Sequence, residues 1–279
     1  MLGPLWRGAC LLIHVLLGAT LAGIALLSGA VRLPCRWVPP VSRWWHRRLC
    51  RCLGLRLSAS GQPQPGALLV ANHISWLDVP VLGALGTISF VSKDEVRRWP
   101  LVGAMATAAG TLYIKRGAHQ AGALVDQIAH RIAQGGSVLI FAEGTTSDGT
   151  GLRRFHPRLF AAAQRDGCPV QPVAIRYGSN AVPDAVAPFI GDDTLARHLL
   201  RVLARPGIRA EVEFLSAIDT AGGLDRRALA DRARNAIAAR LGLHGREVTT
   251  PMSIPHDRSR QRGGAGHPRR SATERHAET

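Results

Sequence analysis

Two short polar segments of this 279-residue chain carry side chains that could do chemistry. The first, residues 72–78, contains His73 and Asp78, and the second, residues 141–149, contains Glu143. Each follows directly after a short apolar run, which predicts a buried strand. In an open α/β sheet, binding loops lie outside the carboxyl ends of parallel strands. We therefore expect the histidine, the aspartate and the glutamate to meet in one crevice.

His73 and Asp78 could act as a general base and the carboxylate that orients it. A carboxylate that accepts a hydrogen bond from one imidazole nitrogen fixes the tautomer, so the other nitrogen can take a proton from a hydroxyl. Serine hydrolases use such a pair to activate their own serine, but no G-x-S-x-G segment follows a strand in this sequence. The hydroxyl could instead belong to the substrate, which favours direct group transfer over a covalent acyl-enzyme.

Four blocks of the sequence occur in an order that is typical of one family. They are residues 72–78 (H-x4-D), 113–117 (Y-I-K-R-G), 141–145 (F-A-E-G-T) and the apolar, proline-containing 170–174. In this order and at these separations they resemble the blocks of the glycerolipid acyltransferase family. The resemblance covers roughly residues 44–214, and four ordered blocks are far more specific than any one of them.

The resemblance implies a transferase that moves a fatty acyl chain from a coenzyme A or acyl-carrier-protein thioester to the hydroxyl of a lysophospholipid. In that mechanism His73 takes the hydroxyl proton and Asp78 orients His73. The family needs no metal, and the resemblance implies no cofactor beyond the acyl-CoA or acyl-carrier protein that serves as co-substrate.

The resemblance also implies an acceptor-binding site. Arg116, with Gly117 beside it, would pair with an acceptor phosphate, which suits the planar fork of a guanidinium group. Glu143, Gly144 and Thr145 would help to shape this site.

Two positions depart from the family pattern. Ala142 replaces the usual proline, and Thr146 stands where the commonest members have an arginine. Losing one charged hydrogen bond to phosphate would weaken binding by about 1.5–3 kcal/mol, unless an arginine at 153, 154 or 158 compensates. Otherwise the acceptor lacks a free phosphate, as a lyso-ornithine lipid does. The breadth of the family places 1-acyl-sn-glycerol-3-phosphate first and lyso-ornithine lipid second.

Residues 9–31 form a nearly unbroken apolar stretch of 23 residues. As a helix it would be about 34 Å long, which is enough for a hydrocarbon core of about 30 Å. Seven arginines follow between residues 32 and 56, so the positive-inside rule predicts an inner-membrane protein whose catalytic domain faces the cytoplasm. Dense arginine directly after the stretch disfavours a cleaved signal peptide. A spanning helix and a re-entrant one both remain open.

We expect an α/β fold with a single mixed, largely parallel sheet flanked by helices and preceded by this membrane helix. Strands are predicted at 67–71, 88–91, 111–114, 137–140, 169–175 and 208–214, and helices at 79–85, 124–132 and 229–241. Prolines in the fifth strand predict a position at the sheet edge or at the start of the strand.

The chain is expected to have four parts. They are a membrane-anchoring helix (1–36), an amphipathic interfacial segment (37–60), the acyltransferase domain (61–245) and a disordered basic tail (246–279). For the second part, with its tryptophans and arginines, a helix packed on the domain is an equally good reading.

The net charge of +16 and the pI near 11.4 predict attraction to polyanions. An anionic membrane surface is the expected partner, and nucleic acid is not, because the core shows no nucleic-acid motif. Five cysteines make an odd number and fit a cytosolic face. Two alternatives remain: a non-enzymatic basic protein that binds membrane or nucleic acid, and a hydrolase or metal phosphatase that uses the same three side chains.

Overall fold

The computed structural model describes residues 3–31, 35–114, 120–179, 182–220 and 222–243. All of them belong to one compact unit, Met1–Thr249. Two residues of the predicted acceptor site, Arg116 and Gly117, lie outside the described residues, as does the predicted tail.

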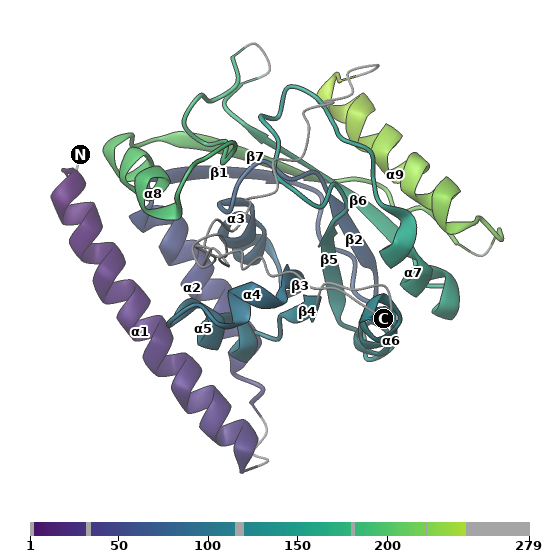
Figure 1. Ribbon diagram of the computed structural model, residues 1–279, viewed down its shortest axis with the longest axis horizontal. Helices are drawn as coiled ribbons and strands as arrows, with labels where there is room; N and C mark the ends of the chain where they lie inside the picture. Colours follow the sequence, from purple (N-terminus) through teal and green to yellow (C-terminus); the bar gives the residue numbers. More distant parts are fainter. Residues whose placement is uncertain (1–2, 32–34, 115–119, 180–181, 221, 244–279) are drawn as a thin grey trace, which may run out of the picture. The chain divides into compact units, whose positions relative to one another are not determined.

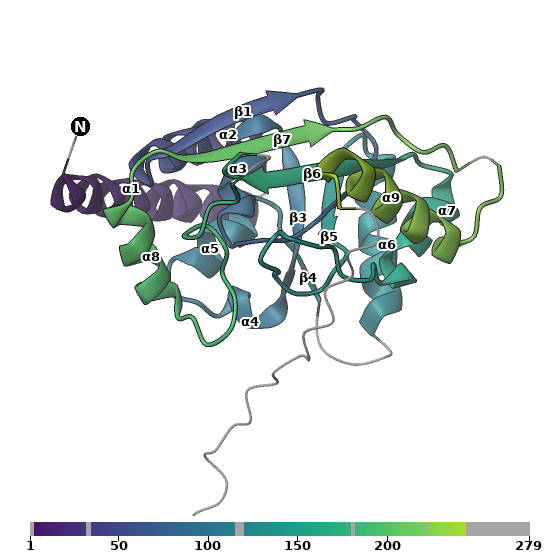
Figure 2. The same cartoon turned by 90° about the horizontal axis from the view of Figure 1, so that it is seen from above.

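A seven-stranded sheet forms the centre of this unit, in the order β1-β7-β6-β2-β5-β3-β4. Neighbouring strands are parallel, apart from β6 and β7, which are antiparallel. This confirms the predicted single mixed, largely parallel sheet (Figures 1 and 2). The strands are β1 (Leu55–Ser60), β2 (Leu68–Ala71), β3 (Ile88–Lys93), β4 (Leu112–Ile114), β5 (Ser137–Phe141), β6 (Val170–Tyr177) and β7 (Ile208–Phe214).

Two apolar layers cover the two faces of the sheet. In β2, Leu69 and Ala71 face one layer, while Leu68 and Val70 face the other, and all four are fully buried. A central parallel strand buried on both faces explains why its sequence is continuously apolar. The first layer contains α2 (Val38–Cys52), α3 (Asp78–Leu85) and α8 (Leu195–Ala204). The second contains α6 (Gln120–Ala133), η1 (Pro157–Phe160), α7 (Ala161–Asp166) and α9 (Arg226–Leu241).

All six predicted strands are present, but the sheet begins earlier than expected. β1 pairs with β7 from Leu55 to Ser60, so the first strand of the sheet lies before residue 61, where the acyltransferase domain was predicted to start. This strand was not predicted, because an edge strand exposes much of its surface and its sequence need not be continuously apolar. In β1 only Leu55 is buried.

The proline-containing strand β6 lies inside the sheet, between β2 and β7, and so it is not an edge strand. It contains one proline, Pro172, which is tolerated because it precedes the part of β6 that pairs with β7. Pairing with β7 begins at Val173, one residue after Pro172. Pro172 contributes only its carbonyl oxygen, which accepts a hydrogen bond of 2.9 Å from the backbone N–H of Leu215.

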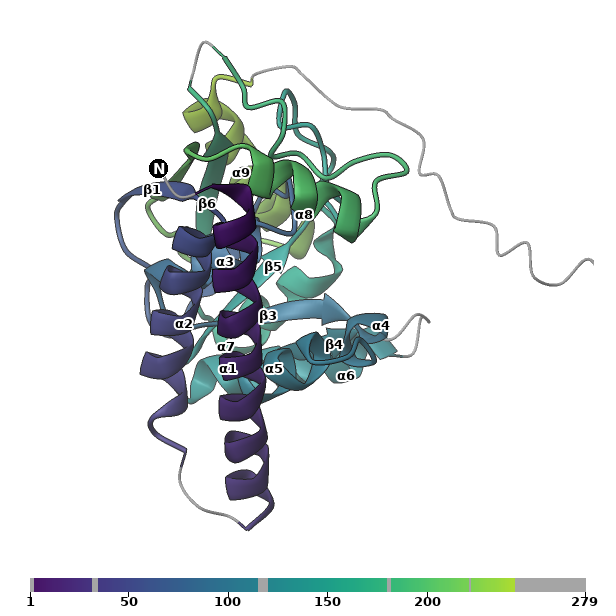
Figure 3. The same cartoon turned by 90° about the vertical axis from the view of Figure 1, so that its left-hand side faces the viewer.

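The N-terminal helix α1 (Pro4–Ala30) has 27 residues and a mean hydropathy of 2.4 over its most apolar window, so its length and composition would allow it to cross a membrane. It lies beside α2 and α5 (Val102–Ala108) and also contacts α8 (Figure 3). The remaining short helix, α4 (Asp94–Arg97), follows β3. Large apolar side chains on the outer side of α1 are exposed, among them Leu5, Leu12, Ile13 and Leu27.

One buried arginine holds the start of α1 in place. Arg7 is 5% exposed, and its guanidinium group donates to the carbonyl oxygens of Cys52, Leu53, Val202 and Leu203. These carbonyls close the C-terminal ends of α2 and α8, where the helix dipole attracts a positive charge. Although α1 has the composition of a membrane helix, its first turns are therefore docked on the folded domain.

Helix α2 packs on α3, as one of its two sequence readings predicted. The contact is close at Gly83, where an added Cβ would lie 2.7 Å from the imidazole ring of His46. Trp45 packs its ring on His14 of α1, with centroids 4.9 Å apart. Trp44, one residue earlier, is 47% exposed. Helix α2 therefore keeps an exposed side, on which its predicted interfacial role would depend.

Candidate active site

The polar loop that follows β2 begins with an asparagine that joins two strands. The side-chain amide of Asn72 donates to the Ile175 carbonyl at 3.0 Å, and its oxygen accepts from the Ile175 N–H at 2.8 Å. The side chain thus pairs with β6 as a backbone group would. The next residue, His73, is thereby placed at the carboxyl edge of the sheet.

His73 and Asp78 form the pair that their spacing predicted. The Nδ1 atom of His73 lies 2.7 Å from the Asp78 Oδ2 atom. The same carboxylate oxygen accepts the backbone N–H groups of Ile74 at 2.8 Å and Ser75 at 3.0 Å. Asp78 is fully buried and is the first residue of α3, where the helix dipole favours a negative charge. These donors stabilise an ionised carboxylate, which fixes the imidazole tautomer.

The outer side of His73 is open. Its side chain is 19% exposed, and its ring stacks on Phe141 with centroids 3.9 Å apart. Among the described residues, none forms a hydrogen bond with its Nε2 atom. That nitrogen can therefore meet a substrate hydroxyl, as a general base must.

Glu143 comes within hydrogen-bond distance of the same loop from the end of β5. Its Oε1 atom accepts the backbone N–H of His73 at 2.8 Å, and its Oε2 atom accepts that of Arg153 at 3.0 Å. The side chain is 2% exposed. Burial raises the pKa of Glu143, and these two hydrogen bonds oppose the rise. Because both of its oxygens accept backbone N–H groups, Glu143 holds the His73 loop in position. Any effect of Glu143 on acceptor binding would act through that loop.

The residues after Glu143 complete this edge of the sheet. Gly144 has φ +72°, and an added Cβ would lie 3.2 Å from the ring of His156. Thr145 is half-buried. Ser147 returns to the first segment, because its backbone N–H donates to the His73 carbonyl at 2.8 Å. The two polar segments therefore meet, as predicted. The roles of Glu143, Gly144 and Thr145 in acceptor binding stay predictions.

Sequence reasoning missed Tyr177. Its hydroxyl donates to the Oδ1 atom of Asp78 at 2.8 Å, inside the protein. A signal was present, because Tyr177 ends a strand parallel to β2, and parallel neighbours end at the same edge of a sheet. The tyrosine was not recognised because it lies 99 positions from Asp78 in the sequence.

The segment before α8 was missed as well. The Trp76 indole donates to Nδ1 of His198 at 2.9 Å, and Nε2 of His198 lies 2.9 Å from the Val186 carbonyl. Burial lowers the pKa of His198, which keeps this ring neutral and suited to both contacts. Phe189 also donates its backbone N–H to the Ile74 carbonyl at 3.0 Å. Residues 186–189 therefore pack against the loop that carries His73.

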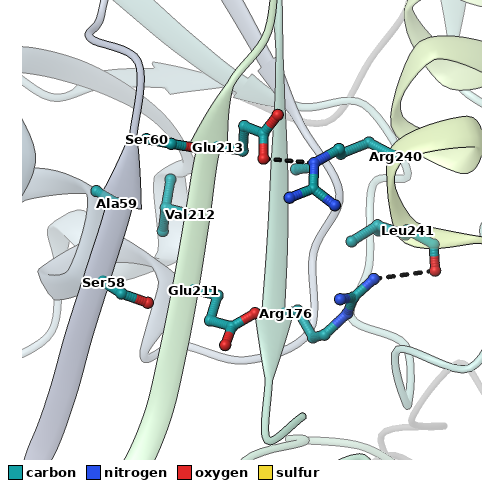
Figure 4. Close-up of a pocket in the computed structure, with 10 residues that line it drawn as sticks. Ser58, Ala59, Ser60, Arg176, Glu211, Val212, Glu213, Arg240 and Leu241 are labelled. Atoms are coloured by element: carbon teal, nitrogen blue, oxygen red, sulfur yellow. Dashed lines mark hydrogen bonds and ion pairs between the residues drawn. The ribbon is translucent and has the colours of Figure 1, made fainter. Parts of the chain in front are cut away.

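Two of the hollows on the surface of the described residues are not lined by His73. One, of about 190 Å³, lies over β1, β6 and β7 beside the end of α9 (Figure 4). Two of its charged side chains are engaged with each other, Arg240 and Glu213, and Arg176 donates to the Leu241 carbonyl. The other, of about 160 Å³, is lined by Ile74 and Tyr177 among others. Within the described part of the chain, no group of three or more His, Cys, Asp and Glu side chains could hold a metal ion.

Comparison with known proteins identifies the class. Residues 56–176 match the family model described as "Acyltransferase". The chain is also 46% identical, over 251 residues, to a lyso-ornithine lipid O-acyltransferase from Pseudomonas aeruginosa, with 88% of this chain and 95% of the relative covered. The chain therefore belongs to the acyltransferase family, as its four sequence blocks predicted, and it is an O-acyltransferase of the glycerolipid type. A non-enzymatic protein, a hydrolase and a metal phosphatase gain no support.

Two further matches bear on the acceptor and the fold. A 1-acyl-sn-glycerol-3-phosphate acyltransferase from Neisseria gonorrhoeae is 33% identical over 184 residues, which cover 64% of this chain and 72% of the relative. The crystal structure of the 1-acyl-sn-glycerophosphate acyltransferase from Thermotoga maritima superimposes with a TM-score of 0.62 at 19% identity. It covers 88% of this chain and 99% of that one. At that identity the likeness concerns the fold alone.

Proposed function

We propose that this chain is a lyso-ornithine lipid O-acyltransferase that works by direct transfer from an acyl thioester. The observation that supports direct transfer is the His73–Asp78 pair. The Nδ1 atom of His73 lies 2.7 Å from the Asp78 carboxylate, whereas its Nε2 atom is open at the sheet edge. The donor is acyl-CoA or acyl-carrier protein.

The reaction then needs one base and one returning proton. His73 Nε2 takes the proton of the acceptor hydroxyl as its oxygen attacks the thioester carbonyl. A C–O bond forms, the C–S bond breaks, and the leaving sulfur receives the proton from the imidazolium. Asp78 stabilises that imidazolium, because its buried negative charge lies against the Nδ1–H group.

This choice places lyso-ornithine lipid before 1-acyl-sn-glycerol-3-phosphate as the acceptor, which reverses the order predicted from the sequence. A lyso-ornithine lipid presents a carboxylate and an ammonium group in place of a phosphate monoester. The identity of 46% to a lyso-ornithine enzyme, against 33% to a glycerophosphate enzyme, supports it. Thr146, in place of the family's arginine, offers no cation there, and its hydroxyl donates to the Phe189 carbonyl. Arg116 would bind the acceptor carboxylate instead of a phosphate.

Helix α1 would bring this site to its lipid. We propose that the exposed apolar side chains of α1 enter the inner membrane while the sheet stays on the cytoplasmic side. Burial of apolar surface in lipid is favourable, and the lyso-lipid acceptor is itself held at the membrane. The exposed arginines of α2, Arg43, Arg47 and Arg48, would face the anionic headgroups.

A purified-enzyme assay tests this proposal. Lyso-ornithine lipid and 1-acyl-sn-glycerol-3-phosphate are offered separately with acyl-CoA and with acyl-carrier protein. We expect an ester product from lyso-ornithine lipid with a kcat/KM at least about tenfold higher. His73→Ala should abolish transfer, and His130→Ala, at an exposed position on α6, is the matched control.

The acceptor assignment has its own variant. Thr146→Arg should improve use of the glycerophosphate acceptor relative to lyso-ornithine lipid, because it restores the cation that the commonest members of the family carry at this position. A wild-type preference for the phosphate acceptor would overturn the assignment and leave the acyltransferase class intact.

A further inference from the structure

The two carboxylate oxygens of Asp78 are held by different parts of the protein. Oδ2 accepts three hydrogen bonds from the loop that carries His73: one from the His73 imidazole and two from the backbone N–H groups of Ile74 and Ser75. Oδ1 accepts one hydrogen bond, from the hydroxyl of Tyr177 at 2.8 Å. Among the described residues no other group donates to Oδ1. Because Asp78 is fully buried, that one donor takes the place of water.

The sheet, and not the loop, fixes the position of the Tyr177 hydroxyl. Tyr177 is the last residue of β6, where it stands opposite Ala210 of β7. Its carbonyl accepts the Asp184 N–H at 3.0 Å, and its ring lies in the same apolar layer as Leu77 and Val81. A donor held this firmly can set both the orientation and the charge of the carboxylate that it meets.

Removing this donor has a predictable effect on the histidine. A carboxylate that loses a hydrogen bond becomes more basic, because that bond stabilises its charged form. A more basic Asp78 holds the Nδ1–H of His73 more strongly and stabilises the imidazolium. His73 would then keep its proton to higher pH, and a protonated imidazole cannot act as a base.

We propose that Tyr177 is a positioning residue that acts through Asp78 and sets the pH range in which His73 works as a base. The proposal rests on the proposed role of His73. Burial and the neighbouring Asp78 hold the pKa of Tyr177 well above its usual range, so the phenol stays protonated and can donate throughout the working range.

The other titratable groups around this network leave room for the effect. Cys50 of α2 faces Tyr177, and burial raises the pKa of its thiol to about 12, so it is neutral. Glu143 faces His73 from the end of β5, and both of its oxygens are engaged by backbone N–H groups. Neither group changes when the Tyr177 hydroxyl is removed.

Tyr177→Phe is the first test, with Tyr113→Phe as matched control. The chain has only these two tyrosines, and the Tyr113 hydroxyl bonds Thr107 instead, at 3.0 Å. In Tyr177→Phe the acid limb of the kcat/KM profile should move upward by about 0.5–1 pH unit. Tyr113→Phe should leave the limb in place. A merely structural role for Tyr177 would lower thermal stability and the plateau without moving the limb.

A second substitution, expected to move the acid limb in the opposite direction, tests the proposal if Tyr177→Phe does not fold. Biosynthetic 3-fluorotyrosine in the Tyr113→Phe background places fluorotyrosine at position 177 alone. Its phenol is more acidic than that of tyrosine and donates more strongly, so the limb should move to lower pH. An unmoved limb in both folded proteins, together with an unmoved titration of the His73 ring, would overturn the proposal.

The titration of the His73 ring separates this proposal from the proposed reaction. It is followed by NMR of labelled histidine, assigned with His73→Ala, and needs no substrate. A ring titration that moves with each substitution supports the coupling through Asp78. If the ring moves while the activity limb stays, the coupling stands and the role of His73 as base is refuted.

Discussion

A buried charged side chain fixes the loop after β2, and another fixes helix α1, but the two have different roles. Asp78 collects four donors within one short loop and one neighbouring strand, and the result is an imidazole with one open nitrogen. Arg7 does the converse. It donates to four backbone carbonyls at the ends of two helices and presents nothing to a substrate. The first network shapes chemistry, and the second holds an apolar helix against the domain.

This contrast separates two kinds of consequence. Damage to the Asp78 network should remove activity while the fold persists, because the sheet and its two apolar layers do not depend on one carboxylate. Damage around Arg7 should loosen α1 while each folded molecule keeps its activity. Measuring turnover and stability on the same variants therefore tests the comparison directly.

The largest expected effect is that of Asp78→Asn on turnover. An asparagine can keep its oxygen toward His73, Ile74 and Ser75 and turn its amide toward the Tyr177 hydroxyl, so the geometry survives and the charge is lost. We expect kcat to fall by about 10³–10⁴-fold, in line with neutralised aspartates in other histidine-based sites. The melting temperature should change little. Turnover within a few fold of the wild type would remove Asp78 from the mechanism.

Arg7→Met tests the other region, with the opposite signature. Methionine keeps the apolar stem but leaves the helix-end carbonyls of Leu53 and Leu203 without their donor. Buried groups stripped of a charged partner cost about 2–4 kcal/mol, measured as the fall in unfolding free energy in detergent. Specific activity per folded molecule should stay near the wild type. A large fall in kcat with unchanged stability would contradict the division of roles.

The same contrast explains which parts of the structure could be predicted. His73, Asp78 and Glu143 were predictable because chemistry demands particular side chains at the ends of apolar strands. Arg7 was not predicted to have a structural role. Its acceptors are backbone carbonyls as far as 196 positions away, and every residue type offers such a carbonyl. Tyr177 was missed for a related reason, since the end of a strand does not reveal which neighbour its side chain meets.

Gly18→Leu tests the packing of α1 with a matched control inside the same helix. A Cβ at Gly18 would lie 2.4 Å from the Trp45 indole nitrogen and 2.8 Å from the Met105 sulfur, whereas a Cβ at Gly23 meets nothing within 4 Å. We expect Gly18→Leu to cost about 1–3 kcal/mol of stability through overpacking. Gly23→Leu should be nearly neutral. Both variants become more apolar by the same amount, so equal losses would show that α1 does not dock on α2 and α5 as described.

The smallest expected effect is a loss of stability in acid that originates in α2. Burial lowers the pKa of His46 to about 4, from an unfolded value of 6.5. Below the unfolded pKa, the unfolded chain binds a proton that the folded protein refuses. Stability is therefore complete above about pH 6.5 and falls as the pH drops toward 4. Between about pH 7 and pH 5.5 the loss should be about 1 kcal/mol.

His46→Gln should flatten this pH dependence, because it removes the titrating ring and keeps a donor for the Ser42 carbonyl, which lies 2.8 Å from Nδ1 of His46. Denaturant midpoints at the two pH values, in the wild type and the variant, measure the difference. His198→Leu is the informative counterpart, since burial lowers the pKa of His198 as well, but this ring contacts Trp76 of the His73 loop. If the comparison holds, His46→Gln changes the pH dependence of stability alone, whereas His198→Leu also lowers turnover, because the Trp76 indole loses its acceptor.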